Sequence, residues 1–333
     1  MPSSELYNIV CKPKAKSCNY TKRSNRRTVV FDEYFEDFSG ISLNTLRRKY
    51  EQYQNFKKTP QWVKNRHAAG KFRRVKATDR PAVLRLKDGG IVGYRVPAHF
   101  VDESLRHVQN LEEWVVEQSE SRIQKRADGT RGVDCVRRYA YWVKYDPAGV
   151  PKLSQDYIRD GEKAADFFER SQLLWDRAVE LFPKHHLPKI FRDLGQYELP
   201  EGQKRLCGLW MGCAVNVGSE NEPVETLPHR DVQGFLHGMS CLCPFGMYSG
   251  GGVVLWELAA VVELNRGDLF FFMDHLLNHS NEKAYGARHS VVAFTEHRVW
   301  DWTQRKYGFI DARVKPLRAS QKRYRVGAKK KQG

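Results

Sequence analysis

Long apolar runs are absent from this chain of 333 residues. None approaches the roughly 20 consecutive apolar residues that a helix needs to cross a bilayer. The opening residues, MPSSE, also lack the apolar region of a secretory signal. We therefore expect a soluble protein that works inside the cell and has no membrane partner.

Cysteine is present, but not in a pattern that builds disulfides or zinc sites. The seven cysteines are an odd number and include no C-x-x-C pair. Cys241 and Cys243 alternate with Leu242 in an apolar run, so we expect reduced residues in a core. No segment repeats at a fixed period, which excludes a solenoid or propeller.

Acidic residues are scarce at the two ends of the chain. Residues 1–80 hold 19 Lys and Arg against seven Asp and Glu, and residues 313–333 hold nine against none. The net charge of +17 therefore leaves −4 for residues 81–312. This pattern predicts a basic, partly helical extension, a folded body and a basic tail. The ends would bind a polyanion such as nucleic acid, or else form solvated tails.

The first part of the body mixes helices and strands. We expect a helix capped by Ser42 that runs toward Pro60, a helix capped by Asp102 or Ser104, and a helix over residues 161–182. Residues 82–86 and 91–96 read as a hairpin around an Asp-Gly-Gly turn, and residues 137–143 as a further strand. The lysine cluster at 329–331 is typical of a nuclear address, so we expect the nucleus as the location.

Short apolar runs separated by Gly, Asn and Asp dominate the region from about 205 to 300. Such spacing indicates an antiparallel sandwich or jelly roll, in an α+β protein whose N-terminal helices buttress the sheets. The expected strands cover residues 206–217, 228–231, 236–245, 253–258, 261–264, 269–273 and 288–294.

Three metal-ligand residues occur within this run. In a strand, His229 and Asp231 would point to the same face, because side chains alternate with a period of two. His279 follows as a third ligand. Two imidazoles and one carboxylate form a facial triad for Fe(II) that leaves positions open for a co-substrate and O2. His275 competes for the third position; we favour His279, because its nine-residue gap to Arg288 fits a tight return through residues 284–287.

A cation and two polar residues complete the predicted site. Arg288 and Ser290 would share a face of the strand that follows, beside the strand that carries His279. An arginine there suits the carboxylate of a dicarboxylic acid through two parallel charge-assisted hydrogen bonds. Asn216 lies in an apolar strand just ahead of the triad. It would either line the pocket or be a satisfied amide at a strand end.

With these motifs in order, residues 205–300 resemble the double-stranded β-helix core of 2-oxoglutarate- and Fe(II)-dependent dioxygenases. The resemblance implies Fe(II), 2-oxoglutarate and O2 as reactants, with succinate and CO2 released as a C–H bond is oxidised. Related halogenating enzymes lack the carboxylate ligand, so the presence of Asp231 implies hydroxylation or oxidation.

Residues 287–295, ARHSVVAFT, and the basic ends are similar to the fungal type of the TET/JBP family of DNA-base dioxygenases. That resemblance implies oxidation of a methylated base, 5-methylcytosine in double-stranded DNA, by a monomer that flips the base from the stack. A protein hydroxylase of the prolyl-hydroxylase type is an alternative. A non-catalytic jelly roll that binds nucleic acid is another.

Overall fold

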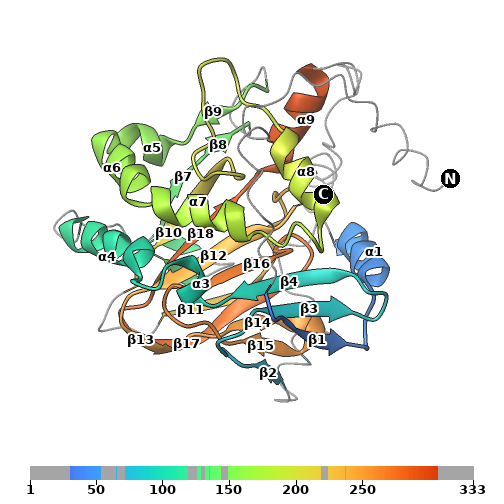
Figure 1. Cartoon of the computed structure of the whole chain (residues 1–333). Helices are drawn as coiled ribbons and strands as arrows, with labels where there is room; N and C mark the ends of the chain where they lie inside the picture. The colour runs from blue at the N-terminus through green and yellow to red at the C-terminus, as the bar shows by residue number, and fades with distance from the viewer. Residues whose placement is uncertain are drawn as a thin grey trace, which may run out of the picture.

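The computed structural model describes residues 31–53, 65, 72–118, 126–128, 132–134, 136–143, 149–218, 224–236 and 238–306. Several predicted features lie outside these ranges: the first 30 residues, the stretch that leads to Pro60, and the tail at 313–333 with its lysine cluster. Within the described ranges no helix is long and apolar enough to cross a membrane. The mixture of helices and extensive sheets expected from the sequence is confirmed (Figure 1).

Two sheets form the body of the protein. The larger has eight strands, in the order β1 (Tyr34–Phe38), β3 (Ala82–Leu86), β4 (Ile91–Val96), β16 (Leu269–Phe272), β12 (Ser240–Phe245), β18 (His289–Phe294), β10 (Gly212–Asn216) and β7 (Val136–Tyr139). The second has the order β11 (Val224–His229), β17 (His279–Gly286), β14 (Val253–Leu255), β15 (Ala260–Val262) and β2 (Arg73–Val75), with β13 (Tyr248–Gly250) also on β17.

The nine strands from β10 to β18 are divided between the two sheets. Strands β10, β12, β16 and β18 belong to the larger sheet, and β11, β13, β14, β15 and β17 belong to the second. Every pairing among these nine strands is antiparallel. The chain therefore passes repeatedly from one sheet to the other, which gives both sheets an inner face to bury.

This crossing corrects one expectation about the site. We expected the strand after Arg288 to return beside the strand of His279, and this is wrong. Strand β18 pairs with β10 and β12, whereas β17 pairs with β11, β13 and β14. At the turn, the Arg288 N–H donates to the Gly286 carbonyl at 2.9 Å, where the chain leaves one sheet for the other.

The chain ahead of residue 80 contributes to both sheets. Strand β1 pairs in parallel with β3, and β2 pairs in parallel with β15. The first helix, α1 (Leu43–Tyr53), begins as predicted after Ser42, whose Oγ accepts the Thr45 N–H at 3.1 Å. The hairpin of β3 and β4 has the predicted bounds. Two described segments of the predicted extension thus pair with strands of the body.

Helices cover the outer side of the larger sheet (Figure 1). They are α3 (Ala98–Val101), α4 (Arg106–Gln118), α5 (Gln155–Asp160), α6 (Glu162–Arg170), α7 (Gln172–Leu181) and α8 (Pro188–Gln196); α9 (His297–Lys306) follows β18. Two small hairpins, β5 (Arg126–Asp128) with β6 (Gly132–Asp134) and β8 (Tyr141–Trp142) with β9 (Lys152–Leu153), complete the described structure.

The prediction of a single helix over residues 161–182 is wrong, because the segment is divided at Ser171 into α6 and α7. The Ser171 hydroxyl donates to the Phe168 carbonyl at 3.4 Å and accepts the indole N–H of Trp175 at 2.9 Å. A serine that bonds back to the preceding turn in this way bends a helix. The bend lets both helices keep an apolar face on the core.

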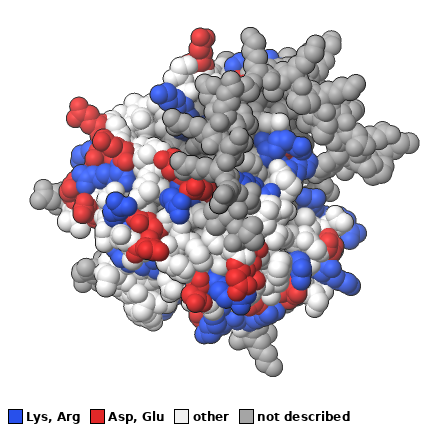
Figure 2. All heavy atoms as spheres, in the orientation of Figure 1, with Lys and Arg blue, Asp and Glu red and all other residues white. Residues whose placement is uncertain are grey.

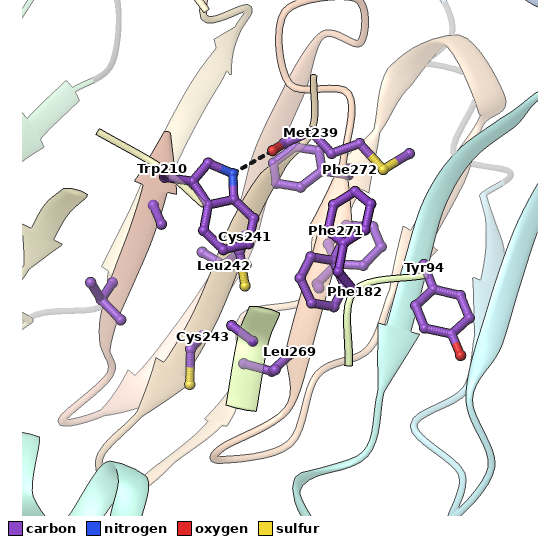
Figure 3. Packing of buried hydrophobic residues seen from close by; sticks show 14 of the residues in the cluster. Tyr94, Phe182, Trp210, Met239, Cys241, Leu242, Cys243, Leu269, Phe271 and Phe272 are labelled. Atoms are coloured by element: carbon purple, nitrogen blue, oxygen red, sulfur yellow. Dashed lines mark hydrogen bonds between the residues drawn. The ribbon is translucent and has the colours of Figure 1, made fainter. Parts of the chain in front are cut away.

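An aromatic layer joins the helices to the larger sheet (Figure 3). Phe271 of β16 lies edge-on to Phe182 at 5.4 Å and is stacked on Trp210 at 6.1 Å. The Trp210 indole donates to the Met239 carbonyl at 2.6 Å, so its polar edge is satisfied inside the core. The four cysteines in the described ranges, Cys207, Cys213, Cys241 and Cys243, are free and buried, as predicted.

A buried ion pair fastens β4 to the turn before β16. Arg95 and Asp268 are 0% and 1% exposed, and their closest atoms are 2.8 Å apart. Arg95 also donates to the Thr78 carbonyl, while Asp268 accepts the N–H groups of Ala98 and Asn265. The segment 265–268, which leads into β16, is therefore held in place by Asp268, whose ion pair with Arg95 is shielded from water.

Replacing Asp268 by alanine is expected to lower the free energy of unfolding by about 3–5 kcal/mol, because Arg95 would remain buried without its partner. Urea denaturation followed by circular dichroism measures this. Asp37→Ala is the matched control, since its pair with Arg85 is mostly exposed and its loss should change stability far less. Equal losses in the two variants would refute the role of the buried pair.

Candidate metal and co-substrate site

Two histidines face each other across the second sheet. His229 is the last residue of β11, His279 is the first residue of β17, and the two are direct partners in the antiparallel ladder. Directly opposite side chains lie on the same face of a sheet. Their ring centroids are accordingly 4.4 Å apart. Phe272 of β16 packs edge-on against His279 at 5.1 Å, so the larger sheet also contacts this pair.

Asp231 joins the histidines from a turn. We expected a strand through residues 228–231, but β11 ends at His229, so the strand-face argument does not apply to Asp231. Its N–H donates to the Asp274 carbonyl at 3.2 Å, and its carbonyl accepts the Gly234 N–H at 2.7 Å. A Cβ at Gly234 would lie only 3.0 Å from that carbonyl, so the tight turn favours glycine.

The structure brings the three predicted ligands together. One ligand-type atom from each of His229, Asp231 and His279 lies within 4.8 Å of the other two. All three residues are half-buried, so solvent and small molecules can reach them. Two imidazoles and one carboxylate are a donor set suited to Fe(II) with positions left open.

Backbone carbonyls orient both rings. Nδ1 of His229 lies 2.7 Å from the Leu227 carbonyl, and Nδ1 of His279 lies 3.0 Å from the Leu277 carbonyl. A ring whose Nδ1–H donates to a carbonyl keeps the Nε2 lone pair for a metal. Each histidine thus makes the same local contact, from Nδ1 to the carbonyl two residues earlier, and this contact leaves Nε2 as the ligand atom.

His275, the competing third ligand, has a different environment. Its side chain is 1% exposed, and its Nδ1 is 3.7 Å from a carboxylate oxygen of Asp274. The clustered atoms of the described residues include His279 and not His275. The choice of His279 as the ligand remains a prediction, now with a geometric reason.

Arg288 is buried, and none of the described residues is its counter-ion. The residue is 3% exposed, and in the described ranges no carboxylate pairs with its guanidinium and its Nε has no hydrogen-bond partner. Burial lowers the pKa of this arginine, although a guanidinium still keeps its charge at neutral pH. The ring of Tyr248 lies beside the guanidinium, with its centroid 5.6 Å from Cζ, and favours the positive charge.

The sequence makes room for Arg288 with a glycine. A Cβ at Gly251 would lie 2.7 Å from both Cδ and Nε of the arginine, and the φ of Gly251 is +70°. Both facts favour glycine at this position. The run of glycines at 250–252, directly before β14, therefore also makes room for the arginine side chain.

Ser290 and Asn216 are partners of each other. They are paired residues of β18 and β10, and the Asn216 amide donates to the Ser290 hydroxyl at 3.2 Å. Ser290 is buried and Asn216 is half-buried. Of the two interpretations of Asn216, a satisfied amide at a strand end agrees with this contact; a role near a co-substrate remains a prediction.

No protein-family model matches the sequence, and no curated protein matches it. Among solved structures, NgTET1 in complex with 5mC DNA is 13% identical, with a TM-score of 0.50 over 76% of this chain and 91% of that one. The chain shares the fold of NgTET1. The resemblance expected from the sequence is thereby confirmed at the level of fold.

Two other solved structures show weaker likeness. A 2OG-Fe(II) oxygenase family oxidoreductase from Burkholderia pseudomallei is 16% identical, with a TM-score of 0.34 over 61% of this chain and 84% of its own. The viral collagen prolyl hydroxylase of Paramecium Bursaria Chlorella virus-1 is 10% identical, with a TM-score of 0.31 over 62% and 96%.

Sequence reasoning missed a buried acid behind the site. Glu257 lies in a 3-10 turn (Trp256–Leu258) where we expected the end of a strand. Its carboxylate accepts two hydrogen bonds from Asn278, one from the backbone N–H at 2.8 Å and one from the side-chain amide at 2.5 Å. Glu257 thus fixes the position of Asn278, which directly precedes His279. Burial raises the pKa of Glu257 to about 7. The one available signal was a single acid within the apolar run 253–258.

His289 was also overlooked. It accepts the Gly218 N–H through Nδ1 at 3.1 Å and packs on Phe245 at 5.3 Å. Burial lowers its pKa to about 4, so the ring stays neutral and remains an acceptor at physiological pH. His289 therefore fixes the start of β18, directly after Arg288, without adding a second charge there.

Proposed function

We propose that this protein is an Fe(II)- and 2-oxoglutarate-dependent dioxygenase that oxidises 5-methylcytosine in DNA and releases succinate and CO2. The observation that carries the proposal is the convergence of His229, Asp231 and His279 within 4.8 Å. The division of strands β10 to β18 between two sheets supports the same proposal, since we take it as the double-stranded β-helix of such enzymes.

The three residues fit Fe(II) by their chemistry. Each histidine has Nδ1 at a backbone carbonyl and offers Nε2, and Asp231 supplies the carboxylate. When bound there, Fe(II) would supply the activation of O2 and of 2-oxoglutarate that no side chain can supply. The protein's own part is to hold three ligands on one side and leave the other positions open.

Arg288 is the residue that we assign to 2-oxoglutarate. A dicarboxylate would give the buried guanidinium the anionic partner that it lacks among the described residues. Tyr248 and Gly251 restrict where that guanidinium can lie, so one carboxylate would be held in a defined place. The burial of Arg288 excludes water from this contact and strengthens it.

A methylated base is the substrate that we propose. NgTET1, whose fold this chain shares over 76% of its length, was determined with 5mC DNA. The charge distribution agrees, because the described face in Figure 2 mixes basic and acidic side chains while the excess of Lys and Arg lies toward the two ends of the sequence. We further propose that the protein acts as a monomer on double-stranded DNA in the nucleus.

Succinate formation tests the proposed activity. We expect Fe(II)-dependent succinate release that rises when duplex DNA containing 5-methylcytosine is added, and rises less with the unmethylated duplex. A proline-rich peptide is the comparison substrate. Stimulation by the peptide alone would replace the proposal with a protein hydroxylase, and no succinate under any condition would leave a non-catalytic binding protein.

Removing residues 1–28 and 313–333 is expected to weaken DNA binding and flatten its salt dependence. Each phosphate neutralised on duplex DNA contributes about −0.9 to the slope of log K against log salt. Fluorescence anisotropy at several salt concentrations measures the slope, with 2-oxoglutarate binding as the control for folding. An unchanged slope would remove the ends from the DNA interface.

A further inference from the structure

We propose a second metal site, formed by Glu33, His185 and His186. Glu33 directly precedes β1, and the two histidines lie in the connection between α7 and α8. Ligand-type atoms of the three residues lie within 4.8 Å of one another. This cluster shares no residue with the site of His229, Asp231 and His279, so it stands apart from the proposed catalytic function.

Both oxygens of one carboxylate face an imidazole nitrogen. Oε1 of Glu33 is 3.1 Å from Nε2 of His185, and Oε2 is 2.6 Å from Nε2 of His186. The Tyr94 hydroxyl donates to Oε1 at 2.5 Å, which orients the carboxylate from β4. The three potential ligands are thus aimed at one another, with a hydrogen-bond donor behind them, as metal-binding carboxylates usually have.

Glu33 has no lysine or arginine partner in the described ranges. Its side chain is 9% exposed, and its carboxylate contacts the imidazoles of His185 and His186 and the Tyr94 hydroxyl. A largely buried carboxylate is stabilised by a cation beside it. A divalent ion held by all three residues would provide that cation.

The donor set favours zinc. Two imidazole nitrogens and one carboxylate oxygen, with a fourth position for water, are a common zinc environment, with bonds of about 2.0–2.2 Å. Ligand atoms around a tetrahedral ion of that size lie about 3.3 Å apart. One ligand-type atom from each residue lies within 4.8 Å of the other two, so the atoms would have to approach one another by at most about 1.5 Å. His185 is 35% exposed, which leaves a route for the ion.

Zinc at this position would fasten β1 to the helical layer. Glu33 and His185 are 152 residues apart in the sequence, so a bond through the metal closes a very long loop. An ion that binds the folded state and not the unfolded state stabilises the folded state. The site would therefore be structural, holding the edge strand β1 against the segment between α7 and α8.

The test uses the full chain with His229→Ala and Asp231→Ala, so that the other site cannot contribute. After treatment with a chelator, Zn²⁺ is titrated by calorimetry, and the melting temperature is measured with and without the ion. We expect one Zn²⁺ per chain and a rise of about 5 °C at a hundredfold excess over Kd. Both should disappear when His186→Ala is added.

His185→Ala is the second variant, because its more exposed ring can be removed with less damage to folding. Cobalt absorption provides an independent readout of nitrogen ligands, and its loss in this variant would support the site. Absence of Zn²⁺ binding to the starting protein would overturn the proposal. Binding and stabilisation that persist in both histidine variants would overturn it as well.

Discussion

Asp231→Ala is expected to abolish the conversion of 2-oxoglutarate to succinate, with a loss of at least about a thousandfold. Asp231 is the only carboxylate in its cluster, and the turn through Gly234 holds it beside His229 and His279. Without it, two neutral imidazoles would remain to bind a divalent ion. Iron content, measured after reconstitution and desalting, should fall together with the turnover.

His275→Ala distinguishes the two candidates for the third ligand. It should retain iron and turnover, because His275 lies outside the cluster, whereas His279→Ala should lose both. Melting temperatures serve as the control, since His275 is buried. Loss of iron in His275→Ala, with iron retained in His279→Ala, would contradict the assignment of His279.

Arg288→Ala is expected to raise the KM for 2-oxoglutarate by about 100- to 4,000-fold. Removing one partner from a buried charged pair costs about 3–5 kcal/mol, and each 1.4 kcal/mol is a factor of ten. Iron binding should be nearly unchanged, because the arginine is not among the clustered ligands. Steady-state kinetics with varied 2-oxoglutarate, together with iron analysis, measure the two effects.

Arg288→Lys is the matched variant for this second prediction. Lysine keeps the charge but cannot form two parallel hydrogen bonds to one carboxylate. We therefore expect a KM between those of the wild type and Arg288→Ala. A KM that stays unchanged in Arg288→Ala would remove the arginine from the co-substrate site, whatever the result for lysine.

Local patterns in the sequence predicted much of the site. His229 and Asp231 are two residues apart, so one turn places both; His279 reaches them through the pairing of β11 with β17, and the sequence indicated it only by the order of motifs in the resembling family. The cap at Ser42 and the hairpin of β3 and β4 likewise depend on contacts between nearby residues. The cap and the hairpin could be inferred because residues close together in the chain determine them.

Long-range pairing could not be inferred in the same way. The sequence did not show that β18 would leave the sheet of β17, because that choice depends on β10 and β12. The ion pair of Arg95 with Asp268 spans 173 residues, and Glu33 meets His185 across 152. Neither pair forms a motif, since each arises only when distant strands and helices pack.

Mass spectrometry of nucleosides from duplex DNA containing 5-methylcytosine tests the central claim most directly. The DNA is incubated with the protein, Fe(II), 2-oxoglutarate and O2, and then digested. We expect 5-methylcytosine to decrease and its oxidised product to appear, in proportion to the succinate formed, and neither change to occur with Asp231→Ala. Unchanged nucleosides in a sample where the wild type forms succinate would contradict the claim that this protein oxidises a DNA base.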